Sequence, residues 1–68
     1  MKIGSKVTIY DRHRFAIPLT AVVCRFSPFN DGVLVLLLES NNPNYPIHST
    51  AWVHEAQLQH ATMDADNG

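Results

Sequence analysis

The chain has few of the residues that cross-link a small protein or bind metals and phosphates. It contains one cysteine, Cys24, in 68 residues, which excludes an intrachain disulfide and a metal cluster built on several thiolates. Its three glycines, Gly4, Gly32 and Gly68, are too dispersed to form a glycine-rich phosphate loop. A chain of this length forms one domain, and it buries only about 60% of the surface that its unfolded form exposes. We therefore expect marginal stability in the absence of a partner.

Long apolar runs and basic clusters are missing as well. No run approaches the roughly 20 apolar residues that span a bilayer, and residues 1–6 show no signal-peptide pattern, so we expect a cytoplasmic protein without a membrane partner. The five basic residues all lie in the first 25 positions, whereas five of the six acidic residues come later. This asymmetry is compatible with a phosphate-binding face, with two complementary faces that meet in a self-assembly, or with an ordinary solvated surface.

The most informative stretch is the six consecutive aliphatic residues 33–38, which follow the turn signal Asn-Asp-Gly and precede Glu-Ser-Asn-Asn-Pro. The short length and the flanking turn residues favour a strand over a helix. Alternate side chains of a strand point to opposite faces. One face carries Val33, Val35 and Leu37, and the other carries Leu34, Leu36 and Leu38. Both faces of the predicted strand are therefore apolar.

A second apolar face predicts a partner, because a small barrel has only one interior. Leaving three such side chains in water would forgo about 5–9 kcal/mol, which is comparable with the stability of a small domain. We therefore expect a homo-oligomer, most simply a two-fold dimer, with Leu34, Leu36 and Leu38 or the alternate set at the interface. The loop around Phe15 and Ile17 can supply part of the cover.

Alternation and turn signals predict three further strands. They cover residues 6–10, 19–26 and 47–53, and the Asp-Gly signal predicts an antiparallel hairpin between 19–26 and 33–38. In the strand over 19–26, Val22, Cys24 and Phe26 are expected to share one face. One helical turn is predicted within 54–59, with Leu58 under the sheet. The domain is expected to cover 1–60, followed by a disordered polar tail over 61–68.

Three segments resemble the strand starts and the ending of SH3-like and KOW-type domains: Ile3-Gly4-Ser5-Lys6-Val7, Gly32-Val33-Leu34-Val35 and Trp52-Val53-His54-Glu55-Ala56-Gln57-Leu58. In outline the chain is most similar to the plasmid-type (type II) dihydrofolate reductases, which act as tetramers with one central active-site pore. The resemblance implies an all-β, small SH3-like barrel of four to five short antiparallel strands with a C-terminal single helical turn, and self-association. That family's active site uses a Val-Gln-Ile-Tyr segment, and the nearest stretch here, residues 49–52, lacks the Gln and the Tyr. No catalytic residue is therefore carried over.

The polar residues do not predict catalysis, a cofactor or a metal. His48, His54 and His60 are spaced six apart, which matches no common ligand pattern, and His13 has two arginine neighbours. Surface histidines and a buried, unreactive Cys24 are the simpler interpretation.

Six aromatic and basic residues form the candidate binding surface: Tyr10, Arg12, Arg14, Phe15, Tyr45 and Trp52. Such a surface suits an extended peptide or a single-stranded nucleic acid. Alternatively, Phe15 and Phe29 plug the ends of the barrel and Trp52 packs at a subunit contact.

Three functions are open at this point. The first is a non-enzymatic binding or regulatory module that acts through protein–protein interaction, by analogy an accessory protein of a phage, plasmid or other mobile element. The second is nucleic-acid binding through the N-terminal cations. The third is an enzyme with its site at an oligomer axis, for which we expect a dihydrofolate turnover assay to be blank.

Overall fold

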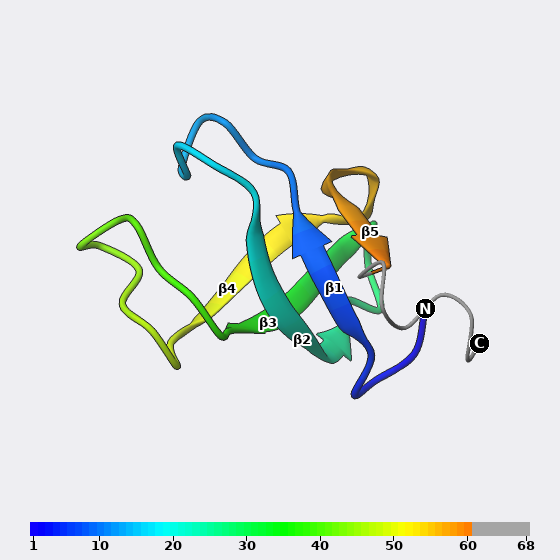
Figure 1. Ribbon diagram of the computed structural model, residues 1–68. Helices are drawn as coiled ribbons and strands as arrows, with labels where there is room; N and C mark the ends of the chain where they lie inside the picture. The colour runs from blue at the N-terminus through cyan, green and yellow to red at the C-terminus, as the bar shows by residue number, and fades with distance from the viewer. Residues whose placement is uncertain (61–68) are drawn as a thin grey trace.

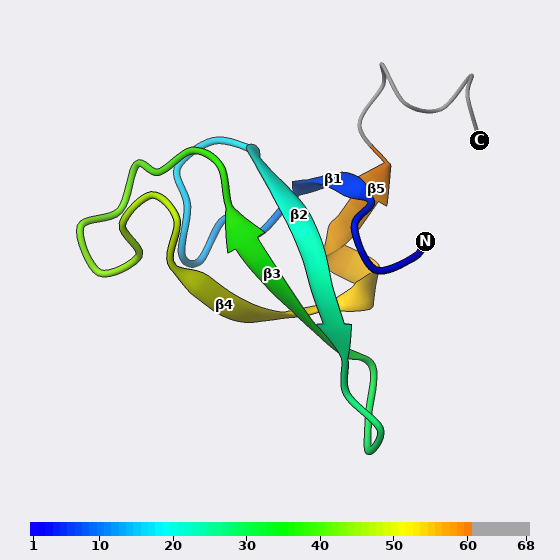
Figure 2. The same cartoon turned by 90° about the horizontal axis from the view of Figure 1, so that it is seen from below.

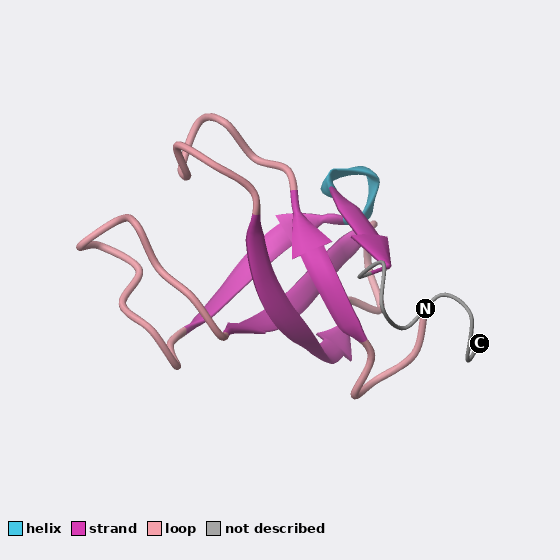
Figure 3. Ribbon diagram, viewed as in Figure 1, coloured by secondary structure: helices cyan, strands magenta, loops and turns pink. Residues whose placement is uncertain are grey.

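The computed structural model describes residues 1–60, which form one sheet of five antiparallel strands and one short helix (Figures 1 and 3). The elements are β1 (Lys6–Ile9), β2 (Leu19–Phe26), β3 (Gly32–Leu37), β4 (Thr50–His54), the 3₁₀ helix η1 (Glu55–Gln57) and β5 (Leu58–His60). The predicted all-β class is confirmed. The tail predicted over 61–68 lies outside the described residues.

The strand order is β4-β3-β2-β1-β5, so the last two strands occupy opposite edges of the sheet. The sheet is curved, and η1 carries the chain from one edge to the other, an arrangement compatible with a small β-barrel (Figure 2). The predicted antiparallel hairpin of β2 and β3 is confirmed. The long β1–β2 and β3–β4 loops lie together at one end of the molecule, whereas the β2–β3 turn projects at another (Figures 1 and 2).

The C-terminal part of the sheet differs from the prediction in two places. The strand predicted over 47–53 begins only at Thr50, because His48 adopts a left-handed φ of 69° and Ser49 N–H donates to the Pro46 carbonyl at 3.0 Å. The predicted helical turn is shorter than 54–59. It is closed by a capping box between His54 and Gln57, after which the chain forms β5 and places Leu58 opposite Ile9 of β1.

A β-bulge in β2 turns Phe26, the last residue of the strand, to the opposite face of the sheet. The register with β3 shifts between Val23 and Arg25, so the extra residue, Cys24, inverts the alternation that follows it. Phe26 therefore pairs with Val33 and packs against the core. The prediction that Phe26 shares a face with Val22 and Cys24 is wrong for this reason.

The core lies under the concave face of the sheet and consists of Val7, Ile9, Phe15, Leu19, Ala21, Val23, Val33, Val35, Leu37, Val53 and Leu58. Phe15 is 1% exposed, as expected of a loop residue that turns back into the barrel. Phe29 and Ile17 do not follow this expectation, since they are 92% and 61% exposed. Phe29 is held at the turn tip by a local bond from its N–H to Ser27 Oγ at 3.1 Å.

The two apolar faces of β3 have different environments. Val33, Val35 and Leu37 are 1% exposed or less, whereas Leu34, Leu36 and Leu38 lie on the convex face and are partly exposed. The loss of about 5–9 kcal/mol that the sequence suggested assumed full exposure. The actual loss is smaller, because each leucine is partly covered within the chain.

Candidate functional site

The β1–β2 loop is organised by a buried carboxylate. Asp11, which follows β1, is only 5% exposed. Its Oδ1 accepts from His13 N–H at 3.0 Å, its Oδ2 accepts from Arg14 Nε at 2.6 Å, and its carbonyl accepts from Phe15 N–H at 2.9 Å. These bonds close a tight turn that directs Phe15 into the core and Arg14 toward β4.

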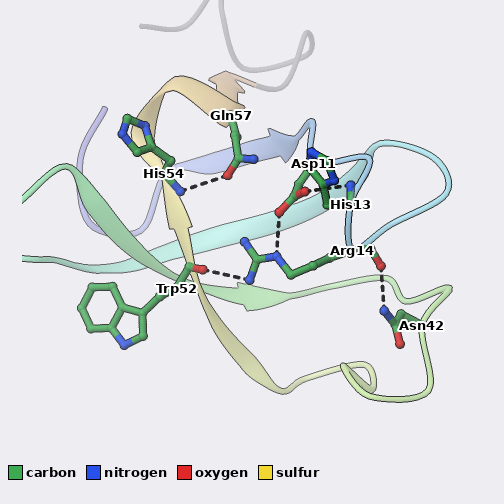
Figure 4. A network of polar contacts seen from close by, with 7 residues as sticks. All are labelled: Asp11, His13, Arg14, Asn42, Trp52, His54 and Gln57. Atoms are coloured by element: carbon green, nitrogen blue, oxygen red, sulfur yellow. Dashed lines mark hydrogen bonds and ion pairs between the residues drawn. The ribbon is translucent and has the colours of Figure 1, made fainter.

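Arg14 then joins three distant parts of the chain (Figure 4). Its Nη1 donates to the Trp52 carbonyl on β4 at 2.9 Å, and its own carbonyl accepts from Asn42 Nδ2 of the β3–β4 loop at 2.7 Å. The guanidinium carbon lies 5.9 Å from the ring centroid of Phe15 and 5.6 Å from that of Tyr45. We call Asp11, Arg14, Asn42 and the Trp52 carbonyl the Arg14 network.

The ion pair in this network is stable around neutral pH. Burial alone raises the pKa of Asp11, but the hydrogen bonds from Arg14 and from His13 N–H outweigh it and hold that pKa below its ordinary value. Burial likewise lowers the pKa of Arg14, but its hydrogen bonds to Asp11 and Tyr45 and the negative charge of Asp11 together more than compensate, so that pKa is raised. Both groups are therefore charged and paired, and Arg14 joins the two long loops to β4.

Two backbone groups on the free edge of β4 are bound by side chains of the same chain. The register with β3 pairs Val53 with Val33 and Leu34 with Trp52, and the bond from Glu55 N–H to the Asp31 carbonyl fixes which groups face β3. The backbone groups of Trp52 and His54 point to the open side, where Arg14 Nη1 binds the Trp52 carbonyl and Gln57 Oε1 accepts from His54 N–H at 3.1 Å. Occupied edge groups disfavour the addition of another strand.

The convex side of the sheet presents a continuous apolar surface. We call this side the outer face; its apolar residues are Val22, Leu34, Leu36, Leu38 and Trp52, and the exposed Arg25 and Thr50 lie in the same rows. Cross-strand pairing makes it continuous, since Val22 lies beside Leu36 and Leu34 lies beside Trp52. Trp52 is 48% exposed, and Figure 4 shows its indole directed away from Arg14.

Gly32 gives the indole of Trp52 a flat surface to lie against. A Cβ at Gly32 would lie 3.5 Å from Trp52 Cε3. A pocket of about 540 Å³ opens beside this contact, lined by Ser27, Asn30, Asp31, Gly32, Trp52, Val53 and His54. The Asp31 and His54 side chains approach to 3.9 Å there, with both groups largely exposed.

The six residues predicted for binding do not form one surface. Arg14, Tyr45 and Phe15 are brought together, but Phe15 belongs to the core and is only 1% exposed. Tyr10 and Arg12 are exposed beside a pocket of about 500 Å³, which Phe15, Ile17 and Pro18 also line. Of the six, Trp52 alone contributes its side chain to the outer face, where the predicted interface residues Leu34, Leu36 and Leu38 also lie.

Two residues of the Arg14 network are absent from the predicted set. Asp11 carries a readable signal, because an aspartate between a strand and a polar loop commonly closes an Asx turn. Asn42 carries none, since its partner is a backbone carbonyl 28 residues away in the chain.

Within residues 1–60 there is no group of three His, Cys, Asp or Glu side chains placed to hold a metal ion, and no helix there is long and apolar enough to cross a membrane. Comparison with protein-family models, with curated proteins and with solved structures gives no match to this chain. Support for the outer face and for the Arg14 network therefore comes from the geometry of this chain.

Proposed function

We propose that this chain is an SH3-like small barrel that acts, without catalysis, as a protein-binding module through its outer face. The fold proposal is supported by the strand order β4-β3-β2-β1-β5, the long first loop and the 3₁₀ turn between the last two strands. The long first loop and the 3₁₀ turn agree with the resemblance stated from the sequence.

The observation that carries the function is the composition of the outer face. A half-exposed tryptophan lies beside Leu34, the first of three partly exposed leucines on a sheet whose opposite side already encloses the core. Contiguous apolar surface on a small domain usually marks a partner site, and tryptophan is among the residues that contribute most binding energy at such sites.

The Arg14 network supports this function indirectly. It fixes the backbone of β4 at Trp52 and ties the β3–β4 loop to the β1–β2 loop. A backbone that is already ordered loses little conformational entropy when a partner binds. The indole is therefore presented from a rigid strand.

Capture on the immobilised chain tests this proposal, with wild type compared with Trp52→Ala and with Tyr10→Ala as the matched control. Both aromatic residues are 48% exposed, but only Trp52 lies on the outer face. We expect proteins, further copies of this chain included, to be retained by wild type and Tyr10→Ala and lost from Trp52→Ala. Retention that is unchanged by Trp52→Ala, or no specific retention, would overturn the proposal.

Nucleic-acid binding is a second candidate, and it is supported by a different surface. Tyr10 and Arg12 are both exposed beside the pocket next to Ile17 and Pro18, and an aromatic ring with a nearby cation suits a stacked base. Fluorescence polarisation with a labelled single-stranded oligonucleotide at about 50 mM salt tests it. Binding that Arg12→Ala weakens supports this candidate, and no binding at that salt removes it.

A further inference from the structure

Resting on the proposed function, we propose that the partner is a second copy of this chain. The two copies meet outer face to outer face about a two-fold axis that runs parallel to β3 and passes by Leu34. The inference names the occupant of the outer face and its orientation, which the capture experiment leaves open.

The row of side chains across the outer face at Leu34 is self-complementary. Leu34 on β3 lies between Arg25 on β2 and Trp52 on β4. A two-fold axis along β3 exchanges the β2 side with the β4 side, so that Arg25 of each protomer lies over the partner's Trp52 while Leu34 meets its own symmetry mate. A guanidinium over an indole is the most favourable cation–π pair, and here it forms twice.

The charges on this surface select that axis over the alternative. The exposed cations Lys6 and Arg25 lie on the β1–β2 side, and the outward residues of β4 are Thr50, Trp52 and His54. An axis along β3 therefore places Arg25 opposite the uncharged Trp52 and Val22 opposite the uncharged Thr50, whereas Lys6 on β1 falls beyond the partner's edge strand. An axis across the strands would place the β1–β2 side against itself, with like charges facing each other.

The next row and the dimensions of the molecule agree with this arrangement. Leu36 lies between Val22 and Thr50, so the same axis packs leucine against leucine in the second row. The molecule extends 32 × 30 × 19 Å, and faces of that size are on the order of the 800 Å² that each partner buries in a stable interface.

Cysteine cross-linking tests the axis directly. In a Cys24→Ser background, Leu34→Cys places a thiol beside the axis and Ile17→Cys places one at an exposed position off the outer face. We expect a bis-maleimide that spans the roughly 10 Å between packed sheets to convert Leu34→Cys, but not Ile17→Cys, into a covalent dimer at low micromolar concentration. Cross-linking of both variants, or of neither, contradicts the proposal.

A double-mutant cycle on the wild-type background tests the cation–π pair. Arg25→Ala and Trp52→Ala should each weaken dimerisation about tenfold in sedimentation equilibrium, and the double variant should be no weaker than Trp52→Ala alone. Additive losses would overturn the pairing, and so would a wild-type mass of 7.6 kDa at all concentrations up to about 100 μM.

The outcomes separate this inference from the function on which it rests. If the protein is a monomer that still retains another protein through Trp52, the dimer proposal is refuted and the proposed binding function stands. A monomer whose capture is indifferent to Trp52→Ala refutes both.

Discussion

Trp52 belongs to two regions, one polar and one apolar. They differ in whether the chain itself supplies partners for the polar groups and cover for the apolar side chains. Its carbonyl lies in the Arg14 network, where the Asp11 carboxylate, the Arg14 guanidinium and the Asn42 amide each have a partner. Its indole lies on the outer face, 48% exposed beside leucines that are also partly open. The polar groups are thus paired within the chain, whereas the apolar side chains are only partly covered by it.

The difference follows from the cost of leaving each kind of group unmatched. A buried polar group without a partner costs about 1–3 kcal/mol, and a second molecule cannot be relied on to supply the missing bond during folding. Apolar surface left in water costs only about 25 cal/mol per Å², and a partner can cover it after folding. Substitutions in the first region should therefore change stability, and those in the second should change association.

Two adjacent leucines give the largest expected effect. Leu37 faces the core at 0% exposure, and Leu36 lies on the outer face. Leu37→Ala should lower the free energy of unfolding by about 4 kcal/mol through the cavity it leaves. Leu36→Ala should lower it by less, about 1–2 kcal/mol in the monomer, because part of that side chain is already in contact with water.

Urea denaturation followed by tryptophan fluorescence measures both values. The protein concentration is lowered until the midpoint no longer depends on it, which removes the contribution of association. Equal losses for the two variants would show that the convex side of β3 is as closed as the core.

Arg14→Ala tests the completed polar region, with Arg12→Ala as its matched control in the same loop. Removal of Arg14 leaves the Asp11 carboxylate at 5% exposure without its cation and also frees the Trp52 carbonyl. We expect a loss of about 2–3 kcal/mol for Arg14→Ala, a value reduced by the partial exposure of the arginine. Arg12 is exposed, so its removal should cost less than about 0.5 kcal/mol. Equal effects in urea denaturation would contradict the assigned role of Arg14.

The pH dependence of stability should carry a signature of Asp11. Its folded pKa is below the ordinary value of 3.8, so it contributes stability that is present above that value and lost as the pH falls through the folded pKa. Asp11→Asn should therefore differ from wild type by a constant amount, about 1.5–3 kcal/mol, between pH 5 and 7. The difference should shrink below about pH 4. A difference that stays flat down to pH 2 would exclude the buried ion pair as its source.

The sequence predicts the features that depend on residues close together in the chain, and it misses those that depend on contacts between distant residues. The strand at 33–38, its two apolar faces and the hairpin with β2 follow from local pattern and turn chemistry. The inversion of Phe26 does not, because a bulge at Cys24 is set by pairing and leaves no mark in the composition.

The candidate site likewise contains residues that the sequence predicts and long-range contacts that it does not. Sequence alone places Trp52 and Leu34 among the surface residues of interest, because both are large apolar residues in predicted strands. It cannot place Arg14 against the Trp52 carbonyl, a contact that spans 38 residues. The inward turn of Phe15 and the outward position of Phe29 are decided by loop hydrogen bonds, which hydrophobicity does not report.

Gly32→Ala should have a smaller effect than the substitutions in the Arg14 network, and it tests the boundary between the β2–β3 turn and the outer face. The new Cβ would lie 2.7 Å from Asn30 Oδ1, so the Asn30 side chain must move and its bond to the Gly32 N–H is lost. It would lie 3.5 Å from Trp52 Cε3, an ordinary contact that leaves the indole in place. We expect a loss of about 1 kcal/mol in unfolding free energy with unchanged tryptophan emission and unchanged dimerisation.

Asn30→Ala is the matched control for this substitution, because it removes the same hydrogen bond from the other side. The double variant should lose no more stability than either single variant, since the two changes share one interaction. A shift in tryptophan emission or in dimer mass for Gly32→Ala alone would show that the turn and the outer face are coupled. In that case the indole is positioned by the turn as well as by β4, and the two regions that meet at Trp52 are not independent.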